Sequence, residues 1–277
     1  MAKNNVNEMS FLDHLEDLRW HLIRIFTAIV ICGFVAFLFK DFIFHIIFAP
    51  TKMGFPTYKT LCQVSQFFGF NDSTFCSDEF PFIIQSRKFA SQFSAHIWTS
   101  FYAGFIISFP YVLYQLWKFI SPGMKTNERK HSRGFIIISS ILFFIGVLFG
   151  YYIISPLSIN FLGTYQVSDQ VDNQFDLDNY VGLIRASVIA SGIIFELPII
   201  IYFLTKVGLV TPEFLKKYRK FALVIVLVFS AIITPPDIAS QIIVAIPILI
   251  LYQVSIFISK MVVKNQKKKQ KKDVKVS

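Results

Sequence analysis

Long apolar runs alternate with short polar segments along the whole of this chain. The runs cover residues 22–39, 89–117, 134–154, 181–205, 221–233 and 238–259. About 20 apolar residues suffice to cross the hydrocarbon core of a bilayer as a helix, because a helix satisfies its own backbone hydrogen bonds. The pattern predicts an all-α integral membrane protein with six transmembrane helices, of which the fifth is short for a full crossing.

The composition agrees with a membrane protein and excludes an ordinary soluble domain. Hydrophobic residues make up 54% of the chain and charged residues 16%, against roughly 25% charged residues in soluble domains. The N-terminus carries the acidic residues Asp13, Glu16 and Asp17 and no small-residue cleavage site follows the first run, so we expect that run to be retained rather than removed as a signal peptide.

Basic residues predict which side of the membrane each loop occupies. Runs five and six could also form one long segment, which would give five spans and place the two termini on opposite sides. With six spans, the N-terminal region, residues 118–133, residues 206–220 and the tail share one side and hold 21 of the 27 basic residues. The positive-inside rule therefore favours six spans with cytoplasmic N and C termini. We expect one membrane domain, residues 1–259, and a basic cytoplasmic tail, residues 260–277.

Charge and motif content narrow the function classes. The net charge of +10 on so hydrophobic a chain indicates cytoplasmic loops, with contact between the lysine tail and anionic lipids, rather than nucleic-acid binding. The sequence has no P-loop, no catalytic triad pattern and no Cys/His cluster. We therefore expect no enzymatic activity, no cofactor and no metal.

Two cysteines lie in the predicted loop between the first two spans, residues 45–87. Cys62 and Cys76 would meet an oxidising compartment if this loop is on the exported side, which allows a disulfide. Two free thiols fit the sequence equally well.

Glu196 lies near the middle of the fourth apolar run, and Pro198 follows it two residues later. An acid at mid-membrane costs roughly 3 kcal/mol on insertion scales, so it needs an explanation. One interpretation is a packed, hydrogen-bonded glutamate with a structural role only. The other is a functional polar site within the membrane, with a proton relay as a minor variant.

The segment from Gln115 to Arg133 joins two spans on the predicted cytoplasmic side, and its one acid, Glu128, is surrounded by basic residues. Glu16 and Asp17 emerge on the same side in the six-span topology. Such acids suit a ligand with two or more guanidinium groups, because a carboxylate accepts a bidentate hydrogen bond from arginine. Internal salt bridges with Arg19 and Arg129 would explain the same acids equally well.

Four groups of residues form motifs in order along the chain. They are Phe11, Leu12, His14, Leu15, Leu18 and Arg19; Phe109 to Trp117 with Phe119, Ile120, Pro122, Gly123, Glu128 and Arg129; Phe195 to Pro198; and Thr234 to Asp237 with Ser240 and Gln241. Together they resemble the motifs of the TatC family, the receptor subunit of the twin-arginine protein translocase. The resemblance spans almost the whole chain in order.

The resemblance implies a curved, glove-shaped bundle of six helices with short fifth and sixth helices. It also implies binding of twin-arginine signal peptides on folded proteins and recruitment of single-span partners of the TatA and TatB kind. It further implies other copies of the chain as partners, export driven by the proton-motive force, and a location in a bacterial inner membrane rather than an organelle membrane. The competing hypothesis is a proton-coupled small-molecule carrier that uses Glu196.

The resemblance also implies roles for individual residues. Glu128, an N-terminal acid, Phe119 and Arg19 would form the signal-peptide surface. The family has glutamate before Leu-Arg where this chain has Asp17, so either Asp17 or the preceding Glu16 is the N-terminal contact. Glu196 would be the polar group in the concave face, and Thr234 and Gln241 would lie near partner helices. The structural positions would be Pro50, Pro122, Pro198, Pro235, Pro236 and Asp237.

Overall fold

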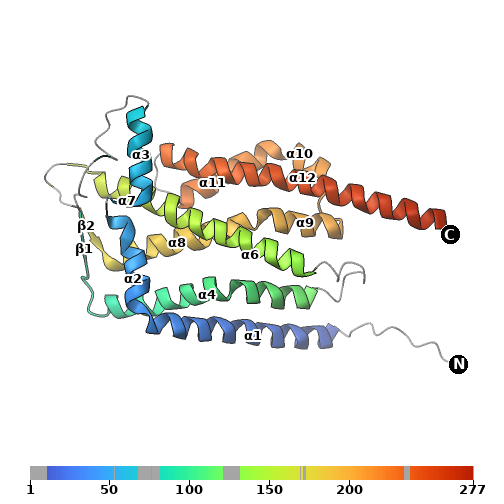
Figure 1. The fold of residues 1–277 in the computed structure, drawn as a ribbon, viewed down its shortest axis with the longest axis horizontal. Helices are drawn as coiled ribbons and strands as arrows, with labels where there is room; N and C mark the ends of the chain where they lie inside the picture. Colours follow the sequence, from blue (N-terminus) through green and yellow to red (C-terminus); the bar gives the residue numbers. More distant parts are fainter. Residues whose placement is uncertain are drawn as a thin grey trace. The chain divides into compact units, whose positions relative to one another are not determined.

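The computed structural model is almost entirely helical (Figure 1). It describes residues 11–52, 54–67, 76, 82–120, 132–168, 170, 173–233 and 238–276. The chain divides into two compact units, one formed by Met1–Ile43 and His96–Ile141 and the other by Phe44–Ala95 and Leu142–Ser277. Each unit is described separately below.

The first unit is built from α1 (Phe11–Leu38), most of α4 (Ser91–Ile120) and the first half of α6 (Ser132–Phe149). The backbones of α1 and α4 touch at a pair of glycines, because a Cβ atom on Gly104 would lie 2.6 Å from Cα of Gly33. Small residues allow such close approach between membrane helices. Near the other end of α1, Nε2 of His96 lies 3.1 Å from the carbonyl oxygen of Phe37, and the two rings stack at 3.9 Å.

The second unit contains the remaining elements. They are the end of α2 (Lys40–Phe48), η1 (Ala49–Thr51), α3 (Pro56–Phe67), β1 (Phe82–Gln85), the second half of α6, the π-helix η3 (Gly150–Ile154), α7 (Ser155–Thr164), β2 (Asn173–Asp176), α8 (Leu177–Phe195), α9 (Leu197–Val207), α10 (Pro212–Lys217), α11 (Arg219–Ile233) and α12 (Ile238–Val276). β1 and β2 pair in parallel, with Phe82 opposite Asn173.

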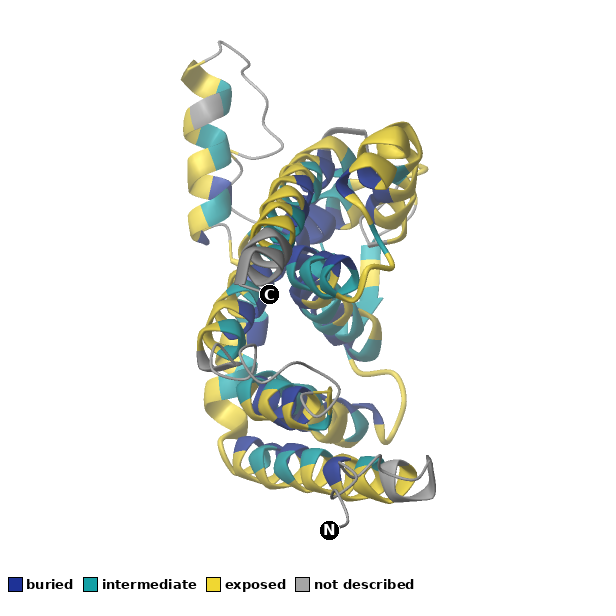
Figure 2. Cartoon of the chain, turned by 90° about the vertical axis from the view of Figure 1, so that its right-hand side faces the viewer, coloured by how far each residue is buried: buried dark blue, intermediate teal, exposed yellow. Residues whose placement is uncertain are grey.

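Five helical segments in the described part of the chain are long and apolar enough to cross a membrane: Leu15–Leu38, Ser91–Ile120, Gly134–Thr164, Leu177–Val207 and Ser240–Lys268. Many large apolar side chains on these helices are exposed, including Phe26, Phe34 and Leu38 on α1. Figure 2 shows the long helices with buried residues on one side and exposed residues on the other. Exposed apolar helix faces of this extent are expected against lipid.

The fifth apolar run forms a helix of its own. α11 has 15 residues and α12 begins as a separate helix at Ile238, so the two runs are not one long segment. Residues 234–237, between them, lie outside the described part. A crossing by α11, and with it the count of six spans, stays a prediction.

Helix also forms outside the six predicted runs. α3 lies within residues 45–87, where the proline-rich sequence suggested only turns, because Pro56 occupies the first turn of a helix, where its missing N–H is harmless. α7 continues the third span through Ser155–Thr164, again with a proline in its first turn. α12 continues to Val276 and so includes the lysine-rich tail.

Tyr58 holds the connections around α3 together. Its side chain is 1% exposed, and its hydroxyl lies 3.1 Å from the carbonyl oxygen of Pro50 and 3.0 Å from that of Pro156. Burial raises the pKa of the Tyr58 phenol, so the hydroxyl stays neutral. Nearby, the Tyr180 hydroxyl donates to the carbonyl of Ile47 at 2.7 Å. These bonds anchor the segment around Pro50 to α7 and α8.

Candidate functional site

A buried polar network joins the beginning of α1 to the end of α4 in the first unit. Nδ1 of His21 lies 2.7 Å from Oε1 of Gln115, and Nε2 of Gln115 donates to the Tyr111 hydroxyl at 2.6 Å. With Oε1 as the acceptor, Nδ1 of His21 carries the proton. His21 is 9% exposed and Gln115 is 4% exposed, so little water competes for this bond.

Aromatic side chains surround this network. The Phe119 ring, one turn after Gln115, meets the His21 ring edge-on with centroids 6.2 Å apart. Trp117 is buried and packs against Phe135 of α6 at 4.5 Å. The last turns of α4 are therefore packed on both sides before the chain enters the 121–131 segment.

The predicted N-terminal contacts lie on different faces of α1. Asp17 precedes His21 by four residues, so the two share the face that meets α4. Glu16 and Arg19 are three residues apart and share another face, directed away from His21. All three charged side chains are exposed. The structure thus separates Asp17 from Glu16, which the sequence did not.

Several predicted residues lie outside the described part of the chain. They are Glu128 and Pro122 in the segment after α4, and Thr234, Pro235, Pro236 and Asp237 before α12. Their roles stay predictions.

Glu196 lies at the junction between α8 and α9 in the second unit. It is 7% exposed, and its carbonyl accepts the N–H groups of Ile199 and Ile200, each at 3.0 Å. Pro198 lies in the first turn of α9, where its lack of an N–H ends the regular α8 pattern and begins a new helix. The neighbours Ile194 and Leu197 pack on an apolar cluster formed by Ile154, Val226, Val244, Ala245 and Ile248. The glutamate is therefore buried beside an apolar core.

Gln241 connects the last two helices. Its Nε2 donates to the carbonyl of Leu227 at 3.0 Å, which ties the beginning of α12 to α11. The side chain is half-buried, and its amide N–H group is used in this hydrogen bond within the unit.

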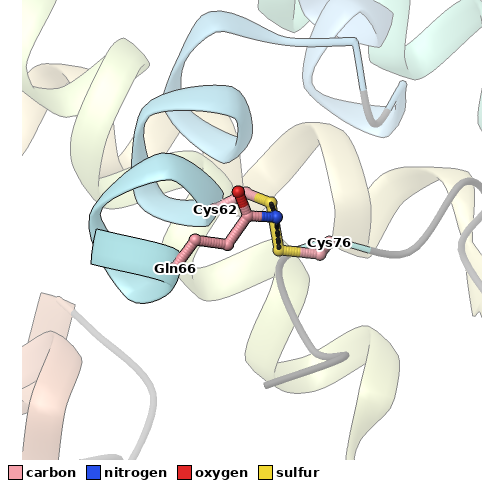
Figure 3. The surroundings of a disulfide bond; sticks show 3 residues. All are labelled: Cys62, Gln66 and Cys76. Atoms are coloured by element: carbon pink, nitrogen blue, oxygen red, sulfur yellow. Dashed lines mark hydrogen bonds between the residues drawn. A yellow bond between two sulfur atoms is a disulfide. The ribbon is translucent and has the colours of Figure 1, made fainter. Parts of the chain in front are cut away.

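The structure pairs Cys62 with Cys76 in a disulfide whose Cα atoms are 5.2 Å apart (Figure 3). Gln66, one turn after Cys62 on α3, places its Nε2 3.5 Å from Sγ of Cys62 and 3.9 Å from Sγ of Cys76. The bond closes the segment that follows α3 back onto the helix. Cys32 is a free thiol in α1.

His21 and Tyr111 were not selected from the sequence as site residues, although Gln115 and Tyr111 lie within the motif residues. The sequence did indicate that His21 and Gln115 need an explanation, because each is a polar residue at the end of an apolar run and needs a polar partner there. Which partner each one takes depends on how α1 and α4 pack. No group of three or more potential metal ligands gathers among the described residues.

Comparisons with known proteins all point to one family. The profile of the family described as Sec-independent protein translocase protein (TatC) matches residues 13–247. The TatC protein of Blattabacterium sp. subsp. Periplaneta americana is 45% identical over 93% of this chain and 97% of its own length. That of Aquifex aeolicus is 34% identical over 95% of this chain and its whole length.

A solved structure agrees with this result. The crystal structure described as the twin arginine translocase receptor TatC in DDM superimposes with a TM-score of 0.69 at 34% identity, covering 89% of this chain and 99% of its own. The family profile, the relatives and the fold agree with the resemblance seen in the motifs, and this multi-span membrane protein belongs to the TatC family of Sec-independent protein translocase components.

Proposed function

We propose that this chain is the signal-peptide receptor of a twin-arginine translocase in a bacterial inner membrane, with both termini cytoplasmic. The surface that binds the two arginines is the end of the first unit where α1 begins and α4 ends. Solved relatives are described as twin arginine translocase receptors, which supports the assignment. Binding, not catalysis, is the chemistry that these side chains suit.

The observation that carries the proposal is the bond between His21 and Gln115. It fixes the rotation of α1 about its axis against α4, and with it the direction in which Asp17 points. Asp17 lies one turn before His21 on the same face of α1, and Phe119 lies one turn after Gln115 on α4, so the two positions are at the same end of the helix pair. A carboxylate beside an aromatic ring offers a guanidinium group both a bidentate hydrogen bond and a stacking surface.

This geometry favours Asp17 over Glu16 as the N-terminal contact. Glu16 lies on the face that carries Arg19, where the two can pair with each other at i and i+3. The internal salt-bridge interpretation therefore applies to Glu16 and Arg19, and the ligand interpretation to Asp17.

Glu128 supplies the second carboxylate. It follows Phe119 by nine residues, after Pro122 and Gly123, and a chain of this length can reach back across the end of α4. Two carboxylates, from Asp17 and Glu128, match the two guanidinium groups of a twin-arginine motif.

A different part of the chain serves partner recruitment. Thr234 and Gln241 are the positions against which single-span TatA- and TatB-type helices pack, and Glu196 is the functional polar group within the membrane. Burial of Glu196 beside the apolar cluster of the second unit supports this assignment, because acids within the membrane are functional by default. The proton-motive force drives the assembly, which includes further copies of this chain.

The test compares two acids that differ by one position. The full chain in detergent is titrated with a fluorescent twin-arginine signal peptide, and with a twin-lysine peptide as the ligand control. Asp17→Asn should weaken binding about 10- to 150-fold, because a hydrogen bond to a charged group contributes about 1.5–3 kcal/mol. Glu16→Gln is the matched control and should change the affinity less than about twofold.

Three outcomes would contradict parts of this proposal. Equal losses for Glu16→Gln and Asp17→Asn would refute the assignment of the faces. Unchanged binding by Asp17→Asn, Glu128→Gln and the double variant would refute the binding surface. Equal affinity for the twin-lysine peptide would remove the role of bidentate recognition.

A further inference from the structure

The second unit has a cavity of about 330 Å³ between α10 and the C-terminal part of α12. Four lysines line it, Lys260, Lys264, Lys267 and Lys268, together with one carboxylate, that of Glu213. The lining is therefore strongly positive. The four lysines lie beyond the stretch that matches the TatC family profile, residues 13–247, whereas Pro212 and Glu213 lie within it.

The lysines share one face of α12. Their spacing of four, three and one residues places all four on the same side of a helix, with Val263 between them. Like charges at this spacing repel one another. A bound anion would offset that repulsion, and Glu213 alone supplies only one negative charge.

Hydrogen bonds hold this part of α12 in place against α9 and α10. They join Thr205 to Ser259 at 2.9 Å, Lys206 to Gln266 at 3.1 Å, and Leu215 to Tyr252 at 2.8 Å. The first two bracket the segment from Lys260 to Gln266. The positive lining is therefore presented by a helix fixed on its scaffold rather than by a loose tail, which lowers the entropic cost of binding a ligand.

The position of the cavity along α12 indicates the source of the anion. Lys260 follows directly after the apolar run 238–259, so the cavity begins where the hydrocarbon core ends. Met261 and Phe214 are exposed next to the lining residues. Ammonium groups combined with exposed apolar side chains at this depth match a phospholipid, whose phosphate and glycerol lie at the same level.

We propose that this cavity binds the phosphate-bearing headgroup of an anionic phospholipid. The lysines contact the phosphate, and Val263 contacts the glycerol end of the acyl chains. Glu213 borders the cavity opposite α12 and opposes anion binding. The site is independent of the signal-peptide surface, which belongs to the other unit.

The test is native mass spectrometry of the delipidated full chain in detergent, titrated with phosphatidylglycerol or phosphatidylcholine. The unaltered chain should retain a first phosphatidylglycerol at lower concentration than phosphatidylcholine. The Lys260→Gln, Lys264→Gln, Lys267→Gln variant should lose about tenfold or more in phosphatidylglycerol affinity, since each lysine near the surface contributes substantially to anionic-lipid binding.

The matched control is Lys216→Gln, Lys217→Gln, Lys220→Gln, which removes the same charge from α10 and α11 and leaves the cavity lining intact. It should retain phosphatidylglycerol affinity within about twofold. Glu213→Gln should raise the affinity, and this variant keeps the test informative if the first variant fails to fold.

Four results would overturn the proposal. They are full phosphatidylglycerol binding by the cavity variant, an equal loss in the control variant, no gain with Glu213→Gln, and displacement of phosphatidylglycerol by equimolar inorganic phosphate or pyrophosphate. The last result would assign the cavity to a free anion instead of a lipid.

Discussion

Replacing Gln115 with leucine should uncouple α1 from α4 at the proposed signal-peptide surface. Leucine has a similar volume but no amide, so His21 loses its acceptor and Tyr111 loses its donor. The two losses are unequal. Tyr111 is 41% exposed and can find other partners, whereas His21 is 9% exposed and leaves a buried N–H without an acceptor.

The magnitude follows from this difference. Side-chain hydrogen bonds between membrane helices average about 0.6 kcal/mol and reach about 1.7 kcal/mol. The buried bond between His21 and Gln115 belongs toward the upper end, and the bond to Tyr111 adds little. We expect Gln115→Leu to lower the free energy of unfolding by about 1–2 kcal/mol.

A double-mutant cycle measures the pairwise part of this effect. The unaltered chain, His21→Phe, Gln115→Leu and the double variant are unfolded with sodium dodecyl sulfate in mixed micelles. The coupling free energy should be about 0.6–1.7 kcal/mol. Thr27→Val is the matched control, because the Thr27 hydroxyl donates to Ile23 within α1 and should combine additively with Gln115→Leu. A coupling below about 0.3 kcal/mol between positions 21 and 115 would refute this packing of α1 on α4.

Two further predictions test other parts of the fold. Gly104→Ala should lower the free energy of unfolding by about 1–3 kcal/mol, because the new Cβ would meet the backbone of Gly33. Gly54→Ala is the control: nothing lies within 4 Å of its new Cβ, so it should cost less than about 0.5 kcal/mol in the same unfolding assay. Equal effects of the two substitutions would contradict the close contact. Cys62→Ser should lower the free energy of unfolding by about 3 kcal/mol, because the disulfide joins two residues with a sequence separation of 14. The reductant dithiothreitol should then destabilise the unaltered chain and the Cys32→Ser control but not the Cys62→Ser variant, and insensitivity of all three would show that the bond does not form.

The motifs predicted the family, and the family profile, relatives and solved structures confirm it. This succeeded because the motifs are local strings of residues whose order can be compared without coordinates. The disulfide was left open for the opposite reason. Whether Cys62 and Cys76 meet depends on the tertiary structure around α3, the helix that carries Cys62. This helix was not predicted, because residues 45–87 were expected to form a loop.

The choice between Asp17 and Glu16 also depends on helix packing, which the sequence does not give. Both are acids next to each other in the sequence, and their chemistry is almost the same. They differ in which face of α1 they occupy relative to α4, and contacts between the two helices, such as that of His21 with Gln115, define that face. A helix repeats every 3.6 residues, so adjacent residues point about 100° apart and only the packed partner gives that difference a meaning.

The sequence by itself determined that this chain is a multi-span helical membrane protein, because the lack of water in a bilayer forces long apolar runs into helices whatever their neighbours are. It also determined the family through its motifs. The tertiary structure alone decided which polar groups meet, namely His21 with Gln115 and Gln241 with the carbonyl of Leu227, and which charged residues line one cavity, namely Glu213 and four lysines of α12. Those pairings join residues far apart in the chain, and their partners are set by helix packing rather than by local composition.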